Sequence, residues 1–131
     1  MEGGKRRFLG LDRGTSCIGR AHAWEDGLVL LGGCIDNDET AFPTIGSILV
    51  SGHYTDIVIG QPKEHNRLSR RFEKFVHDLQ YLGSELTIHR VDETYSSVMA
   101  RDILASYQKS IYDDAVSAMV ILQRFFDHRP S

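Results

Sequence analysis

The feature of this sequence that most constrains its fold is the pair Asp26-Gly27, which stands between two apolar-rich runs at residues 17–25 and 28–36. Asp-Gly readily adopts the backbone conformations of tight hairpin turns, so the two runs predict adjacent antiparallel strands. A short apolar run at residues 7–12 predicts one more strand before them. The start of the chain is therefore expected to form a three-stranded antiparallel meander.

Beyond the meander, strand-like and helix-like segments alternate. Strands are expected at residues 55–60 and 86–92, and helices at residues 43–52, 66–82, 96–107 and 113–126. Strands that alternate with helices predict parallel pairing, with the helices covering the sheet. The predicted fold class is therefore α/β: a mixed sheet in which the antiparallel meander is followed by parallel strands, flanked by helices.

Two of these helices carry end signals. Pro43 suits the first turn of a helix, where its missing N–H is not needed. Asp113 can accept a hydrogen bond from a first-turn N–H, and it is expected to cap the last helix. The apolar spacing of that helix predicts an inward face made of Val116, Met119, Val120 and Phe126.

Length and composition favour one soluble domain. The chain has 131 residues, of which 41% are hydrophobic, so residues 1–131 are expected to form a single domain with its own core. No apolar run is as long as a membrane span, and no secretory signal follows the charged N-terminus. These observations predict a cytoplasmic protein that contacts no membrane.

Cysteine count and net charge argue against further classes. Cys17 and Cys34 are too few for a disulfide scaffold, and neither belongs to a Cys-x-x-Cys pair, which argues against a zinc site. The six histidines show no metal-ligand spacing and are expected to be solvated or packed. The formal net charge of −3 argues against a protein that coats nucleic acid by charge alone, but it is compatible with a nuclease that binds metal ions.

Three acidic residues stand at the ends of elements that could bring them together. Asp12 ends the first strand, Glu93 follows the strand at residues 86–92, and Asp114 opens the last helix. Carboxylate oxygens suit Mg²⁺ or Mn²⁺, and two such ions can support phosphodiester hydrolysis. The alternative is that each acid only ends a strand or caps a helix.

The segment around Asp12 is typical of two known settings. A strand that ends in Asp-x-Gly-Thr, here Asp12 to Thr15, occurs in ribonuclease H-like nucleases and in the phosphate loop of the actin and sugar-kinase fold. The second setting needs two such domains, whereas this chain is expected to hold one. Four segments in order also resemble the YqgF/RuvX family: LGLDRGTSCIG at 9–19, IVIGQP at 57–62, VDETYSS at 91–97 and DAVSAMVILQ at 114–123.

The resemblance to this family implies an RNase H-like fold and a metal-dependent nuclease that acts on structured nucleic acid. It implies 5′-end processing of precursor 16S rRNA during ribosome biogenesis, or cleavage like that of a Holliday junction resolvase. The matching catalytic and metal-binding positions are Asp12, Glu93 and Asp114, with two Mg²⁺ or Mn²⁺ ions as cofactors. The implied partners are precursor rRNA or branched DNA, and a pre-ribosomal particle. RNA or DNA, and monomer or homodimer, stay open.

Basic residues that the family places near the nucleic acid are missing from this chain, where Ser16, Cys17 and Thr94 stand instead. Other groups are expected to contact nucleic acid in their place: Arg13, Thr15, Arg67, Arg70 and Arg71. For the last three arginines, the alternative is a solvated helix face. For the whole protein, the alternative is a catalytically weak or inactive RNase H-fold module for nucleic-acid binding or ribosome assembly.

Overall fold

The computed structural model describes residues 5–13, 17–61, 67–83, 85–92 and 113–128. Within these residues, five strands form one sheet with the order β3-β2-β1-β4-β5. The strands are β1 (Arg7–Arg13), β2 (Cys17–Trp24), β3 (Val29–Asp36), β4 (Asp56–Gln61) and β5 (Thr87–Asp92). Strands β1, β2 and β3 pair antiparallel, whereas β4 runs parallel to β1 and β5 runs parallel to β4. The predicted mixed sheet is therefore confirmed.

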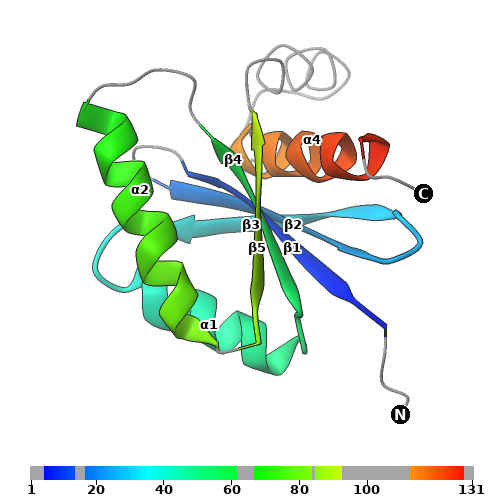
Figure 1. The fold of residues 1–131 in the computed structure, drawn as a ribbon, viewed down its shortest axis with the longest axis horizontal. Coiled ribbons are helices and arrows are strands. Elements are labelled where there is room, and N and C mark those ends of the chain that lie inside the picture. The colour runs from blue at the N-terminus through cyan, green and yellow to red at the C-terminus, as the bar shows by residue number, and fades with distance from the viewer. Residues whose placement is uncertain (1–4, 14–16, 62–66, 84, 93–112, 129–131) are drawn as a thin grey trace.

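Helices cover both faces of this sheet (Figure 1). On one face lie α1 (Ala41–Ser51) and α2 (Arg67–Leu79), which continues into the 3₁₀ turn η1 (Gln80–Leu82); α4 (Asp113–Asp127) crosses the other face. The first face buries a core that includes Leu9, Ile59 and Phe75. The second face buries a smaller core that includes Phe8 and Ile121. The helix predicted at residues 96–107 lies outside the described residues.

The alternation of side chains along β1 decides which face each of its residues reaches. Leu9 and Leu11 join the core under α1 and α2, whereas Phe8 joins the core under α4. Gly10 also faces α4, because a Cβ atom there would lie 2.6 Å from a leucine side chain of that helix. The same alternation places Asp12 on the α4 face.

The hairpin between β2 and β3 forms at the predicted place, but its turn is longer than expected. The Gly27 N–H donates to the Trp24 carbonyl over 3.0 Å, and Gly27 has a φ of +86°, in the left-handed region. This arrangement is typical of a three-residue hairpin loop that ends on glycine. The loop is therefore one residue longer than the pair Asp26-Gly27. As a result, the pairing near the turn is moved by one position, so that Ala23 faces Val29.

A β-bulge at Gly32 reverses this one-residue shift of the register. Ala21 pairs with Leu31 and Arg20 pairs with Gly33, so Gly32 is the extra residue of β3. A Cβ atom at Gly32 would lie 2.5 Å from the carbonyl oxygen of Arg20. The close approach of the two strands at the bulge therefore requires glycine.

The bulge decides which side chains of β3 face α4. Beyond it, Cys34 pairs with Gly19 and Ile35 pairs with Ile18. Gly19 faces α4, because a Cβ atom there would overlap the backbone of that helix. Directly paired residues point to the same side of a sheet, so Cys34 also faces α4, and Ile35 enters the core under α1 and α2. A regular strand would have placed Cys34 opposite Ile18, on the other face.

The inward face of α4 agrees with the predicted one only in part. The helix packs on the sheet core through Ala118, Ile121 and Leu122. Of the predicted residues, Met119 and Phe126 are partly buried and pack against this core, whereas Val116 and Val120 are buried in a cluster of their own. The sheet offers small residues to α4, including the glycine in the middle of β1. The contact therefore joins large apolar side chains of α4 to glycines of the sheet, and the apolar spacing of the helix does not reveal where those glycines lie.

Helix starts agree with the sequence signals to within two residues. α1 begins at Ala41, so Pro43 lies in its first turn as expected. α4 begins at Asp113, which is therefore the first residue of the helix and not the residue before it. In the part of the chain that the structure describes, no helix has the length and apolar character needed to cross a membrane.

Candidate active site

The candidate site lies at one end of the sheet, where three parallel strands finish. Strands β1, β4 and β5 run the same way, so Arg13, Gln61 and Asp92 end them at a common edge. Figure 1 shows α4 beginning close to this edge and running back across the sheet. In α/β folds, ligands bind at the carboxyl ends of the parallel strands. This edge is therefore where the predicted acids should act.

Asp12 and Asp114 reach this edge on the same face of the sheet. Asp12 pairs with Gly19 of β2, and both residues point toward α4. A Cβ atom at Gly19 would lie 1.9 Å from the carbonyl oxygen of Asp114, so the first turn of α4 rests directly on β2. Both acidic residues are half-buried. The glycine thus allows a helix start and a strand end to come together.

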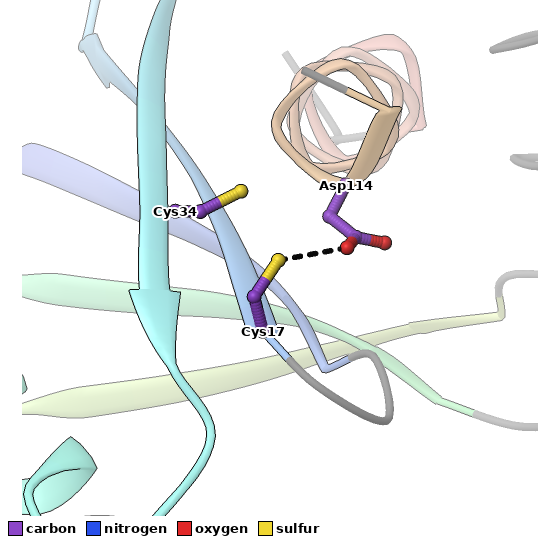
Figure 2. A group of neighbouring side chains, drawn as sticks. All are labelled: Cys17, Cys34 and Asp114. Carbon is purple, nitrogen blue, oxygen red and sulfur yellow. Dashed lines mark hydrogen bonds between the residues drawn. The ribbon is translucent and has the colours of Figure 1, made fainter. Parts of the chain in front are cut away.

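Two cysteines adjoin these acids. The Cys17 thiol donates a hydrogen bond to Oδ2 of Asp114 over 2.9 Å. The Cys34 thiol lies beside them, and the three ligand atoms are all within 4.8 Å of one another. Figure 2 shows the side chains of Cys17 and Cys34 pointing from β2 and β3 toward the start of α4. Burial raises the pKa of Cys17, and the hydrogen bond to Asp114 raises it further.

The sequence prediction missed this pair of cysteines because it considered spacing only within one segment. The signal was in the hairpin: with Asp26-Gly27 as a two-residue turn, residue 19 faces residue 34. Cys17 and Cys34 are then diagonal neighbours on one face of the sheet. The longer turn and the bulge cancel, so the structure reaches the same pairing by another route.

Two predicted positions lie outside the described residues, and a third is described only in its backbone. Glu93 and Thr15 lie outside the described residues. Glu93 follows directly after Asp92, the last residue of β5. Asp113 is described as the first residue of α4, without its side chain. The convergence of all three acids, including Glu93, into one metal shell therefore stays a prediction.

The predicted basic residues lie toward α2. The Arg13 guanidinium stands 5.2 Å from the centre of the Phe75 ring, on the face opposite to Asp12. Burial lowers the pKa of Arg13, and the charge of Arg71 lowers it further. Arg70 and Arg71 are exposed on α2, and Arg67 begins that helix, although its side chain is not described. The two described acids lie on the α4 face and the predicted arginines on the α2 face. A nucleic acid that contacts both would therefore have to cross the end of the sheet.

The other end of the sheet holds a buried cluster of charged groups. Asp56, at the start of β4, is 0% exposed and forms an ion pair with Arg6. It also accepts a hydrogen bond from the Thr55 hydroxyl over 2.5 Å and contacts Nε2 of His89 over 2.7 Å. Burial alone would raise the pKa of Asp56, but the hydrogen bonds from Arg6 and its other partners outweigh it, and the pKa is lowered. His89 is thus neither solvated nor simply packed.

Comparison with known proteins agrees with the fold and with the predicted family. A family model described as RuvX: Holliday junction resolvase matches residues 6–128. Among solved structures, T. thermophilus RuvC in complex with Holliday junction substrate is similar, with a TM-score of 0.62 and 11% sequence identity. The similarity covers 93% of this chain and 94% of that chain, and it shows a shared RNase H-like fold. No curated protein matches the chain.

Proposed function

We propose, from the premise that this chain belongs to the RuvX family of Holliday junction resolvases, that residues 1–131 form one nuclease domain. The domain hydrolyses phosphodiester bonds in structured nucleic acid with the help of divalent metal ions. The observation that supports this proposal is that Asp12 and the first turn of α4 lie on one face of the sheet, at the carboxyl edge, both next to Gly19. Glu93, the residue after β5, is the third acid of the proposed site.

The donor groups fit a hard cation. Asp12 and Asp114 offer carboxylate oxygens, which Mg²⁺ and Mn²⁺ prefer. Both side chains are half-buried, so an ion can reach them from solvent. Together with Glu93 they would hold two ions. When bound, such ions activate a water molecule and stabilise the leaving oxygen of the phosphodiester.

The remaining groups position the reacting parts. The Cys17 hydrogen bond orients the carboxylate of Asp114. Arg13 has an Nε that is buried without a hydrogen-bond partner among the described residues, and Arg70 and Arg71 are exposed nearby on α2. Arginine N–H groups pair readily with phosphate oxygens. We assign these arginines, with Arg67 and Thr15, to the contact with the nucleic-acid backbone.

Within this class, we propose the 5′ end of precursor 16S rRNA as the substrate, in a pre-ribosomal particle in the cytoplasm. A branched DNA junction is the second candidate. It is favoured by the description of the family and by the substrate in the similar RuvC structure. A monomer suits cleavage at one RNA end, whereas a homodimer suits a symmetric junction.

A binding module without cleavage is the alternative of a different class. Ser16, Cys17 and Thr94 replace basic residues of the family, and this loss weakens the contact with phosphates. A module of this kind would bind structured RNA or DNA equally well with and without divalent ions.

The test is a cleavage assay on precursor rRNA, four-way DNA junctions and linear duplexes, with Mg²⁺ or Mn²⁺. The wild type is expected to cut one structured substrate only when the ion is present, and Asp12→Asn is expected to lose cleavage. Asp127→Asn is the matched control, because Asp127 is an exposed acid at the far end of α4. Binding without any cleavage would favour the module, and cleavage that survives Asp12→Asn would reject the proposed site.

A further inference from the structure

Three metal-binding side chains gather at the start of α4 from three separate elements. Cys17 comes from β2, Cys34 from β3 and Asp114 from α4, and their ligand atoms all lie within 4.8 Å of one another (Figure 2). These are the only cysteines of the chain. Cys34 is exposed and the other two residues are half-buried, so the cluster is open to solvent on one side. An ion could therefore enter without any movement of the backbone.

The backbone is built to hold this cluster. Gly19 lets α4 rest on β2, which brings Asp114 to the Cys17 thiol. The bulge at Gly32 turns Cys34 to the same face. The close approaches at Gly19 and Gly32, where no Cβ atom fits, thus both help to bring the three donor side chains together. The arrangement is set by the strands and helix, and not by a chance rotation of surface side chains.

A shared ion fits this geometry better than a disulfide does. Cys17 pairs with Asp36 and Cys34 pairs with Gly19, so the cysteines are diagonal neighbours. Diagonal neighbours lie about 7–8 Å apart at Cα, whereas disulfides require Cα atoms less than about 7 Å apart. Both cysteines are thiols in the structure. Donors of one tetrahedral Zn²⁺ ion, at about 2.0–2.3 Å from the metal, lie roughly 3.3–3.8 Å from one another, which small side-chain rotations can reach here.

We infer that Cys17, Cys34 and Asp114 bind one thiophilic divalent cation of the Zn²⁺ class, with the fourth tetrahedral position open to solvent. Two thiolates and one carboxylate form a donor set that suits Zn²⁺. Mg²⁺ prefers an all-oxygen shell and is not expected here. On binding, each thiol releases its proton to water.

This site shares Asp114 with the nuclease site, so the two occupancies compete. The consequence rests on the proposed function: an ion held by the two thiolates withdraws Asp114 from the Mg²⁺ or Mn²⁺ shell. Zn²⁺ should therefore inhibit cleavage even when Mg²⁺ is in excess. Cys17 stands where the family has a basic residue, so this competition is a property of this chain and not of the resemblance.

The binding test uses the full chain and the metals alone, without nucleic acid. Co²⁺ is added as a spectroscopic probe, because thiolate ligands give it an intense charge-transfer absorption, and Zn²⁺ affinity is then measured by displacement of Co²⁺. One ion per chain is expected. Cys17→Ser, Cys34→Ser and Asp114→Asn should each weaken Zn²⁺ binding by at least about 10–100-fold, the range found when even an indirect metal partner is lost.

Asp36→Asn is the matched control, because Asp36 pairs with Cys17 but is not one of the three clustered donors. It should bind Zn²⁺ as the wild type does. Circular dichroism confirms that each variant is folded, and serine keeps a hydrogen-bond donor at position 17. Absence of the charge-transfer absorption in the wild type, or unchanged Zn²⁺ affinity in both serine variants, would overturn the inference. So would a Cys17–Cys34 disulfide that forms readily in air.

A second measurement separates this inference from the proposed function. Cleavage in excess Mg²⁺ is titrated with Zn²⁺, and each variant is compared with its own rate without Zn²⁺. Inhibition should be strong in the wild type and at least about tenfold weaker in Cys34→Ser, in line with the lost affinity. Mg²⁺-dependent cleavage without Zn²⁺ binding would reject the inference and leave the nuclease standing. Zn²⁺ binding without cleavage under any condition would reject the nuclease and leave the Zn²⁺ site standing.

Discussion

The two ends of the sheet treat their carboxylates in opposite ways. At the end where β4 begins, Asp56 is fully buried, and protein donors fill its oxygens. At the end where β1 finishes, Asp12 and Asp114 stay half-buried and accessible to ions. A carboxylate satisfied by protein donors has its charged form stabilised within the fold, whereas an accessible one can exchange its partners for a cation. Burial, and not the charge alone, thus separates the structural acid Asp56 from the two candidate catalytic acids.

The largest expected effect comes from the accessible end. Asp114→Asn should reduce cleavage by about 10²–10³-fold, the size of effect seen when one group that stabilises transition-state charge is lost. Its free energy of unfolding should change by no more than about 2 kcal/mol, the upper size of the attraction between a partly buried carboxylate and a helix N-terminus. Steady-state cleavage and urea denaturation measure the two effects on the same preparation.

Asp113→Asn is the control for this prediction. Asp113 is the neighbouring residue and begins α4, and asparagine keeps the shape of the side chain while losing only the modest attraction of a carboxylate to the helix N-terminus. Most of the activity should therefore remain. An equal loss in both variants would show that the wrong acid of the pair was assigned to the metal.

A substitution at the buried end should lower the stability of the protein and leave its activity unchanged. Asp56→Ala is expected to lower the free energy of unfolding by about 3 kcal/mol, because it leaves Arg6 and His89 without their shared partner. The value lies at the low end of the usual range since the Arg6 side chain is 39% exposed. Urea denaturation measures it, with Asp127→Ala as an exposed control that should stay within about 0.5 kcal/mol.

The activity per folded molecule of Asp56→Ala tests the contrast between the two ends of the sheet more directly. It should match the wild type at a temperature where both are folded. A variant that is stable yet inactive would mean that the buried cluster acts in catalysis, and the contrast between the two ends would fail.

A third change tests the close contact between the first turn of α4 and β2. Gly19→Ala adds a Cβ atom that would lie 1.9 Å from the Asp114 carbonyl oxygen, so the start of α4 must move. Overpacking of this kind destabilises by about 1–3 kcal/mol, and cleavage should fall with it. Gly33→Ala is the matched control, because the nearest atom to its Cβ would be a flexible arginine nitrogen at 3.9 Å. Equal effects of both changes on unfolding would contradict the close contact.

The smallest effect concerns acid stability. The hydrogen bonds to Asp56 lower its pKa below the unfolded value of about 3.9. The stability from this group is therefore fully present above that pH and is lost as the pH falls through the folded pKa. Between about pH 5 and pH 2, Asp56→Ala should lose less of its free energy of unfolding than the wild type does. Urea denaturation at a series of pH values gives the two slopes, and identical slopes would speak against the buried cluster.

Local signals were enough for most of the sheet. Asp26-Gly27 marked the hairpin, and the buried runs before and after it gave the strands in the right order. The side of the sheet that Asp12 reaches also follows from simple alternation, as does the opposite side for Arg13. The family resemblance predicted the RNase H-like fold, which the comparisons bear out.

Contacts between distant segments could not be predicted in the same way. The pairing of Asp56 with His89 depends on the register between two parallel strands, which no turn fixes. The face of α4 depends on where glycines in the strands leave room, so the apolar spacing predicted Met119 and Phe126 but missed Ile121 and Leu122. The two cysteines were predictable in principle from the hairpin, but only by counting across its turn.

The extra residue at Gly32 also bears on how a gene for such a hairpin can change length. A one-residue insertion into a paired strand normally exchanges the two faces of everything beyond it. Here the surplus residue is set aside, and Cys34 and Ile35 keep the faces that a strand one residue shorter would give them. Loss of this codon would thus yield a straighter hairpin with the same thiol toward α4. A substitution of Gly32 by a larger residue cannot be accommodated in this way, because its side chain would clash with the Arg20 backbone. Deletion of Gly32 is therefore expected to disturb the strand pairing less than its replacement by a larger residue.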